Sequence, residues 1–225
     1  MTPTHFAPVN DSVFGAPFVL RGVKAAIGTA DALSYWAISD QFEERGRPPA
    51  LFHGGFGLLT VGNLRKPRFW ALDLLDRLGR LGPERLAVAA AGDGAGGLVD
   101  ALAARGPGGA VALLMWNGTL DQGKVDGDRL LDQQVTVRVR GLAPGRCRHT
   151  LYRVDAGHGN IVAEWRELGA PDWPDPEGWR ALHAADRLDP AEPPRELPAP
   201  SGELELELGL PMPGVALVVL APARP

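Results

Sequence analysis

The sequence has few of the features that mark several common classes of protein. It contains one cysteine, Cys147, among 225 residues, so a disulfide within the chain is excluded. No segment concentrates Lys and Arg and the formal net charge is −4, which argues against a nucleic-acid or anionic-membrane partner. No apolar run reaches the roughly 18 residues of a membrane span. The first residues contain neither the basic n-region nor the apolar h-region of a signal peptide. A cytoplasmic location is therefore expected if Met1 is the true start.

Motifs for metals and cofactors are also sparse. The five histidines show no i,i+4 pair and no C-x-x-C occurs, so no metal and no cofactor are predicted. Gly92, Gly94 and Gly97 form a G-x-G-x-x-G, followed by residues that could form the helix of a dinucleotide-binding unit. That unit needs an acidic residue after its second strand, whereas Asn117 follows the next apolar run. A glycine-rich turn is therefore favoured, with a nicotinamide-dependent oxidoreductase as an alternative.

Glycine and proline are abundant, with 29 and 21 residues, and both are typical of turns. The first 80 residues nevertheless show helical spacing twice. Apolar residues recur at three and four positions from Val13 to Ile27, although Pro17 lies inside this pattern, and a second helix is predicted from Pro67 to a stop at Gly79. Between them, residues 32–38 are typical of a short buried strand. Residues 39–64 show neither period and are predicted to form a long, functional loop.

The pattern changes after residue 80, where short apolar runs alternate with turn residues. Strands are predicted near residues 86–91, 98–103, 110–116, 133–140, 148–154, 203–208 and 214–221, with an irregular stretch over 157–200. Many short strands separated by turns indicate an antiparallel β-sandwich. The predicted fold class is thus α/β plus all-β, with one domain over residues 1–80 and an all-β domain over 81–225.

The strongest local signal for function lies in residues 34–59. Seven of the 15 aromatic residues fall between Tyr35 and Trp70. The segment combines Trp36, the paired carboxylates Glu43 and Glu44, and His53 among glycines. Carboxylates bind sugar hydroxyls through charge-assisted hydrogen bonds, and aromatic faces stack on sugar rings. This chemistry alone supports two interpretations equally. One is a sugar site, and the other is a structural role in which the Glu pair is solvated and the aromatics lie in the core.

Two catalytic interpretations of this segment fail on its residues. His53-Gly54-Gly55 is similar to the oxyanion loop of esterases, but the G-x-S-x-G motif of those enzymes is absent. Glu43 and Glu44 are adjacent, so their side chains diverge, whereas a retaining glycosidase needs carboxyls about 5–5.5 Å apart across the scissile bond. One of the two is expected to contact a ligand and the other to support it.

The segments SYWAISDQFEE (34–44) and ALFHGGFGLL (50–59) resemble the end of the catalytic domain of glycoside hydrolase family 39, in its bacterial β-xylosidase branch. The resemblance covers nearly the whole chain. It continues through Leu64–Pro67, Leu113–Asn117, Arg153–Asp155 with His158 and Asn160, Gly169–Pro171 and Trp173-Pro174.

The resemblance implies a retaining hydrolase on a (β/α)₈ TIM barrel with an accessory β-sandwich. Residues 1–80 would then be the C-terminal piece of the barrel, and 81–225 the sandwich. Trp36 would line the sugar subsite, Glu43 and Glu44 would bind sugar hydroxyls, and His53 would support them. The implied ligand is a small sugar or xylo-oligosaccharide.

The sequence departs from the family in one respect that decides its chemistry. The family's acid/base Glu follows an Asn, and its nucleophile lies in a Thr-Glu-aromatic motif; neither pattern occurs in this sequence, which resembles the family only from just after the nucleophile. No catalytic residue is therefore predicted, and the chain is expected to be inactive alone. The alternative is a non-catalytic module that binds a glycan or braces a partner, such as a complementing chain that carries the rest of the barrel.

Overall fold

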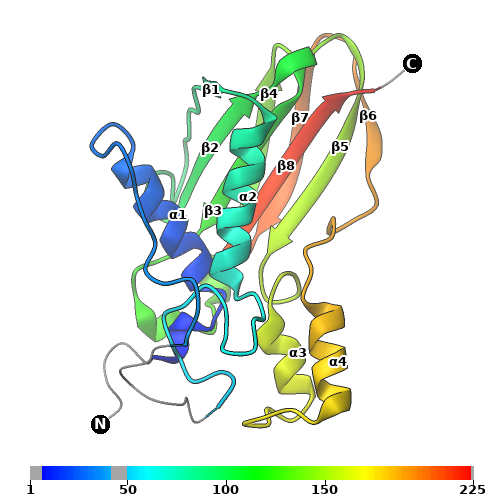
Figure 1. Ribbon diagram of the computed structural model, residues 1–225. Helices are drawn as coiled ribbons and strands as arrows, with labels where there is room; N and C mark the ends of the chain where they lie inside the picture. Colours follow the sequence, from blue (N-terminus) through cyan, green and yellow to red (C-terminus); the bar gives the residue numbers. More distant parts are fainter. Residues whose placement is uncertain (1–6, 42–49, 224–225) are drawn as a thin grey trace.

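The computed structural model describes residues 7–41 and 50–223 (Figure 1). Two helices precede the first five strands, and two shorter helices precede the last three. In order, the elements are α1 (Gly15–Ala26), α2 (Pro67–Leu81), β1 (Glu84–Leu86), β2 (Val99–Arg105), β3 (Val111–Asn117), β4 (Gln133–Arg140), β5 (Gly145–Val154), α3 (Ile161–Glu167), α4 (Pro176–Ala185), β6 (Arg195–Ala199), β7 (Glu203–Leu210) and β8 (Gly214–Pro222), with short 3₁₀ turns between them.

The strands form two antiparallel sheets. Six strands pair in the order β1-β2-β3-β8-β5-β6, and β4 pairs with β7 alone. Alternation along each strand sends side chains to opposite faces. In β3, Leu114 and Trp116 enter one apolar cluster while Met115 enters another, and in β8 Leu217 and Val218 divide in the same way. The central strands are therefore buried on both faces, which explains their nearly continuous apolar sequences.

One face of the larger sheet is covered by α1 and α2 (Figure 1). Leu20 of α1 and Leu74 of α2 pack there with Trp116, and all three are fully buried. Pro17 is compatible with α1 because it is the third residue of the helix, where the backbone N–H has no helical acceptor. The predicted division at residue 80 remains a prediction, and the two helices before it share one core with the strands after it.

The opposite face of the larger sheet packs against the β4–β7 pair. Val137, Leu206 and Leu208 from that pair join the second apolar cluster with Met115 and Val218. The strict Glu-Leu alternation of β7 produces this arrangement, since its leucines point inward and its glutamates outward. On the outer face Arg138 pairs with Glu205, at 2.6 Å between Nε and Oε2.

The stretch over 157–200, predicted to be irregular, contains α3, α4 and β6. The start of α4 has ordinary signals: Asp175 accepts a hydrogen bond from the Gly178 amide at 2.7 Å, and Pro176 occupies the first turn. Both helices are short, and α3 lies against the long loop through a third cluster that includes Leu51 and Ile161. Such short helices carry too little periodic sequence to be recognised from one chain.

The remaining predictions for the fold meet mixed outcomes. The strand near 86–91 is reduced to β1, and the other six predicted strands coincide with observed ones.

The G-x-G-x-x-G is a turn in which Gly92 and Gly94 have φ of 101° and 83°, and strand β2 follows it rather than a helix. The dinucleotide-binding interpretation is therefore wrong. No helix in the described part of the chain is long and apolar enough to cross a membrane.

Candidate functional site

The segment that carries Trp36 lies outside the core. The prediction of a buried strand over residues 32–38 is wrong: these residues form no strand, and Leu33, Trp36 and Ile38 are 61%, 74% and 62% exposed. A strand is held by hydrogen bonds to neighbours, and within the described chain the adjoining residues make one parallel bridge, from Ser39 to Leu59. The segment is apolar, as a buried strand would be, but within the described residues no sheet lies beside it.

The backbone just after Trp36 is nevertheless well anchored. The Leu58 amide donates to the Ala37 carbonyl at 3.1 Å, and the Leu59 amide donates to the Ile38 carbonyl at 2.9 Å. The Asp40 amide in turn donates to the Leu59 carbonyl at 2.9 Å. The exposed indole of Trp36 is thus attached to backbone that is fixed by its neighbours, so a ligand stacking on it would not have to order that backbone.

His53 introduces the glycine-rich part of the loop. It is half-buried, and its Nδ1 lies 3.0 Å from the Ala50 carbonyl oxygen. Gly54 follows with φ of 78°, and a side chain there would lie 2.6 Å from the backbone of Ala7. Gly57 approaches the Asp40 backbone so closely that a Cβ would lie 2.4 Å from it. The glycines are therefore required by close packing as well as by turn conformation.

Beneath this loop lies a fully buried lysine. The Lys66 ammonium is 2.5 Å from Asp11 Oδ1 and 2.6 Å from Asp40 Oδ2, and it donates to the Gly55 carbonyl at 2.7 Å. The Lys66 side chain has no exposed surface, and the two carboxylates are almost as buried. Burial raises the pKa of Asp40 above its ordinary value of 3.8, an effect that the neighbouring Lys66 ammonium opposes.

The two carboxylates also hold the loop directly. Asp11 Oδ2 accepts a hydrogen bond from the Gly54 amide, and Asp40 Oδ1 accepts one from the Gly57 amide, both at 2.7 Å. One buried ammonium therefore joins three segments: the residues before α1, the end of the Trp36 segment, and the His53 loop. The structure brings these segments together although Asp11 and Gly54, which are hydrogen-bonded, lie 43 positions apart in the sequence.

A second cation braces the same region. The buried Arg68 side chain donates to the Tyr35 hydroxyl, and its Nη2 donates to Asn10 Oδ1 at 3.1 Å. The Tyr35 hydroxyl donates onward to the Phe56 carbonyl at 2.8 Å. Tyr35 therefore links α2 to the loop from the side next to Trp36.

Of the four residues predicted to bind sugar, the structure places two. Trp36 and His53 lie in the two segments that Asp40 joins. Glu43 and Glu44 lie outside the described residues. The exposed indole of Trp36 offers a stacking surface and the half-buried imidazole of His53 a polar group, which are the two kinds of contact that a sugar ring needs. The binding roles of all four residues remain predictions.

Asp11, Asp40 and Lys66 are functional residues that the sequence alone does not predict. Asp11 lies in a run of helix-capping residue types, but its carboxylate bonds to the Gly54 amide, and α1 begins at Gly15 without a side-chain cap. Lys66 did carry a signal. It immediately precedes the first residue of α2, where the positive end of the helix dipole disfavours a cation. A lysine at this position therefore indicates that a nearby negative charge stabilises it.

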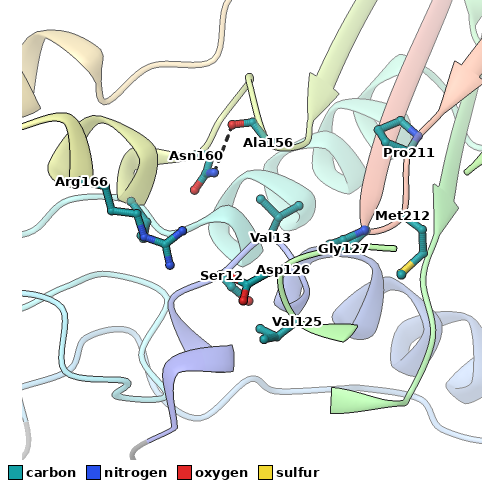
Figure 2. Close-up of a pocket in the computed structure, with 12 residues that line it drawn as sticks. Ser12, Val13, Val125, Asp126, Gly127, Ala156, Asn160, Arg166, Pro211 and Met212 are labelled. Carbon is teal, nitrogen blue, oxygen red and sulfur yellow. Dashed lines mark hydrogen bonds between the residues drawn. The ribbon is translucent and has the colours of Figure 1, made fainter. Parts of the chain in front are cut away.

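A cavity of about 150 Å³ lies beside the start of α3 (Figure 2). It is bordered by the residues before α1, the loop after β3, the start and last turn of α3, and the turn between β7 and β8. Its lining consists of Ser12, Val13, Val125, Asp126, Gly127, Ala156, Asn160, Val162, Arg166, Pro211, Met212 and Pro213. Neither Trp36 nor His53, the two predicted sugar-binding residues that the structure describes, is among them. In residues 7–41 and 50–223, no group of three His, Cys, Asp or Glu side chains could hold a metal ion.

Comparison with known proteins relates this chain to a family of glycosyl hydrolases. The family model described as glycosyl hydrolases family 39 matches residues 2–204. A β-xylosidase from Geobacillus stearothermophilus is 28% identical over 181 residues, covering 79% of this chain and 32% of the relative. The chain thus spans about a third of the length of that curated relative.

Solved structures resemble the chain along almost its entire length. The GH39 enzyme from Xanthomonas axonopodis pv. citri superposes with a TM-score of 0.79 at 26% identity, covering 99% of this chain and 43% of that protein. A monomeric β-xylosidase from Caulobacter crescentus CB15 superposes with a TM-score of 0.78 at 26% identity, covering 99% and 44%. Both proteins therefore contain a region with the arrangement of helices and sheets described above.

Proposed function

Because this chain belongs to glycosyl hydrolases family 39, we propose that it is the C-terminal part of a retaining glycoside hydrolase that acts on β-xylosides. The match to the family over residues 2–204 and the similarity to named β-xylosidases support this proposal. In this view α1, the Trp36 segment, the His53 loop and α2 are the closing piece of a (β/α)₈ barrel, and the two sheets are its accessory β-sandwich.

The observation that carries the proposal is the exposed Trp36 ring on anchored backbone beside the His53 loop. Trp36 would stack on the apolar face of the xylose ring. Glu43 and Glu44 would accept hydrogen bonds from its hydroxyls, and His53 would support them. Such contacts accelerate hydrolysis only to the extent that they strengthen in the transition state.

The two catalytic carboxylates belong to motifs that this sequence does not contain, since no Asn-Glu and no Thr-Glu pair occurs in it. In a retaining enzyme one carboxylate forms the glycosyl-enzyme and the other protonates the leaving oxygen. We therefore propose that the 225-residue chain binds sugar without hydrolysing glycosides.

The purified chain is expected to release no chromophore from an aryl β-xyloside above the rate in buffer, because the nucleophile and proton donor are both lacking. The measurement is a continuous absorbance assay at several protein concentrations. The Trp36→Ala variant is the matched control, since a contaminating xylosidase would be unaffected by it. Turnover that scales with protein concentration and falls in Trp36→Ala would contradict the proposal of inactivity.

A second candidate function is a non-catalytic module that binds a glycan or braces a complementing chain. Phe18, Leu33, Trp36 and Ile38 are all more than half exposed, and the Trp36 segment runs back alongside α1 (Figure 1). Exposed apolar groups of this size favour a covering partner. The partner proposed is a polypeptide that carries the rest of the barrel.

Titration with xylose and xylo-oligosaccharides separates a retained sugar site from a role restricted to bracing a complementing chain. If the sugar site is retained, we expect saturable binding that Trp36→Ala weakens by about tenfold or more, since a buried aromatic contact contributes about 1.5 kcal/mol or more. A chain without a retained sugar site would instead show no saturable binding, and its uncovered apolar groups would make it self-associate with rising concentration, measured by sedimentation. Binding that is unchanged in Trp36→Ala would contradict the assignment of this residue.

A further inference from the structure

Asp40 is the residue through which the Trp36 segment and the His53 loop meet. Its backbone amide donates to the Leu59 carbonyl at 2.9 Å, and its Oδ1 accepts a hydrogen bond from the Gly57 amide at 2.7 Å. Asp40 follows Trp36 by four positions, and Gly57 follows His53 by four. The main chain and the side chain of one residue therefore hold together the two segments that carry predicted sugar-binding residues.

The His53 ring also lies close to the Asp40 carboxylate. A Cβ added to Gly55 would lie 2.5 Å from Asp40 Oδ1 and 2.9 Å from His53 Nε2. Both atoms therefore approach the same point on the main chain, and only glycine leaves room for them there. A change in the position of the Asp40 side chain would alter the packing around the His53 ring.

Lys66 fixes the orientation of the Asp40 carboxylate. Its ammonium is 2.6 Å from Asp40 Oδ2, so the oxygen that does not bind the Gly57 amide is held as well. The same ammonium is 2.5 Å from Asp11 Oδ1 and donates to the Gly55 carbonyl at 2.7 Å. A carboxylate that is bonded at both oxygens has one orientation, and a lysine without exposed surface cannot exchange these partners for water.

We propose that Asp40 and Lys66 are positioning residues of the sugar site, which fix the Trp36 segment and the His53 loop in the arrangement that binds the sugar. This inference rests on the proposed function and identifies what prepares its site. Neither side chain touches the ligand, because neither has exposed surface. They act by ordering the two segments before the sugar arrives, and a site ordered in advance loses less entropy on binding.

The triple variant Asp11→Asn, Asp40→Asn, Lys66→Met separates this role from a role in stability. It leaves no unpaired buried charge, so its fold is expected to remain stable, but no ammonium then links residues 11, 40 and 55. We expect its Kd for xylotriose to be raised about fivefold or more, the cost of ordering one or two side chains on binding. The measurement is isothermal titration calorimetry at a temperature where circular dichroism shows a folded chain.

The single variant Asp40→Asn gives the same test if the triple variant does not fold. It keeps the pair between Lys66 and Asp11, and its side chain can still accept from the Gly57 amide. We expect it to raise the Kd about threefold or more, since the ammonium no longer holds residue 40.

Trp116→Ala is the matched control, because it removes a fully buried side chain far from the site. Trp116 lies in the cluster with Leu20 and Leu74, and none of the described members of that cluster belongs to the Trp36 segment or the His53 loop. This variant should keep the Kd within about twofold of the wild-type value, although it destabilises the fold.

Hydrogen exchange provides a measurement that needs no sugar. In the triple variant the amides of Gly54, Gly57 and Leu59 should exchange about tenfold or more faster relative to the amides of β3, which report the stability of the whole fold. Loop amides that keep their wild-type rates relative to β3 would overturn the inference, because the network would then not be what orders the loop.

A wild-type Kd in the folded triple variant, or in Asp40→Asn, would show that the network only stabilises the fold, and would overturn the inference. An equal rise of the Kd in Trp116→Ala would also overturn it, since any loss of stability would then weaken binding. These results leave the sugar site itself intact. If xylotriose shows no saturable binding to the wild-type chain, the proposed sugar site is absent, and the positioning role is overturned together with it.

Discussion

Replacing Lys66 by methionine is expected to lower the free energy of unfolding by about 3–5 kcal/mol. Methionine retains most of the apolar stem but removes the ammonium, which leaves Asp11 and Asp40 buried, close together and without a cation. An unpaired buried charge loses hydration without recovering it from a partner. The measurement is urea denaturation at neutral pH, followed by far-UV circular dichroism.

The triple variant Asp11→Asn, Asp40→Asn, Lys66→Met is the informative control. Each asparagine can still accept a hydrogen bond from the Gly54 or Gly57 amide, as the aspartates do, but no net charge is left in the buried region. We therefore expect the triple variant to recover much of the lost stability. A loss below about 1 kcal/mol in Lys66→Met would contradict the central role of the ammonium, since exposed ion pairs cost that little.

Repeating the urea denaturation at acidic pH tests the protonation of Asp40. The pKa of Asp40 is raised in the folded protein, so between its ordinary value of 3.8 and that raised value the folded state holds a proton that the unfolded state has released. Stability from this group therefore decreases as the pH rises through that window. Asp40→Asn should remove this contribution, and the difference between the two proteins isolates it from the other carboxylates.

Replacing Trp116 by alanine is expected to cost about 3–5 kcal/mol, and by the usual scaling to lower the Tm by roughly 6–20 °C. The indole is completely buried between the helical layer and the larger sheet, where it joins Leu20 of α1 and Leu74 of α2 in one cluster. Its removal leaves a cavity that touches both layers. Thermal unfolding should still show one transition, because the layers share this core.

The matched control for Trp116→Ala is Trp36→Ala, which makes the same chemical change at an indole that is 74% exposed. We expect the control to change stability by less than about 0.5 kcal/mol. Two separate transitions, one for the helices and one for the sheets, would contradict a common core. That result would instead favour independent domains over residues 1–80 and 81–225.

The elements with a clear period could be predicted from the sequence alone. The alternation in β7 and the apolar runs of β3 and β8 locate strands, because side chains on a strand alternate between two faces whatever surrounds it. The spacing of apolar residues likewise locates α1 and α2. Short elements such as α3 and β6 are not predicted from the sequence, since a few residues cannot establish a period.

The motifs around Trp36 and His53 also sufficed to identify the family, since they are runs of neighbouring residues. The tertiary structure alone decided what supports and surrounds them. Asp11, Asp40 and Lys66 meet at distances of 2.5–2.6 Å although no local pattern connects them. The Trp36 segment is exposed because the burial of an apolar run depends on which strands lie beside it. The cavity near Arg166 likewise joins four distant segments, and contacts of that kind follow from packing and not from sequence period.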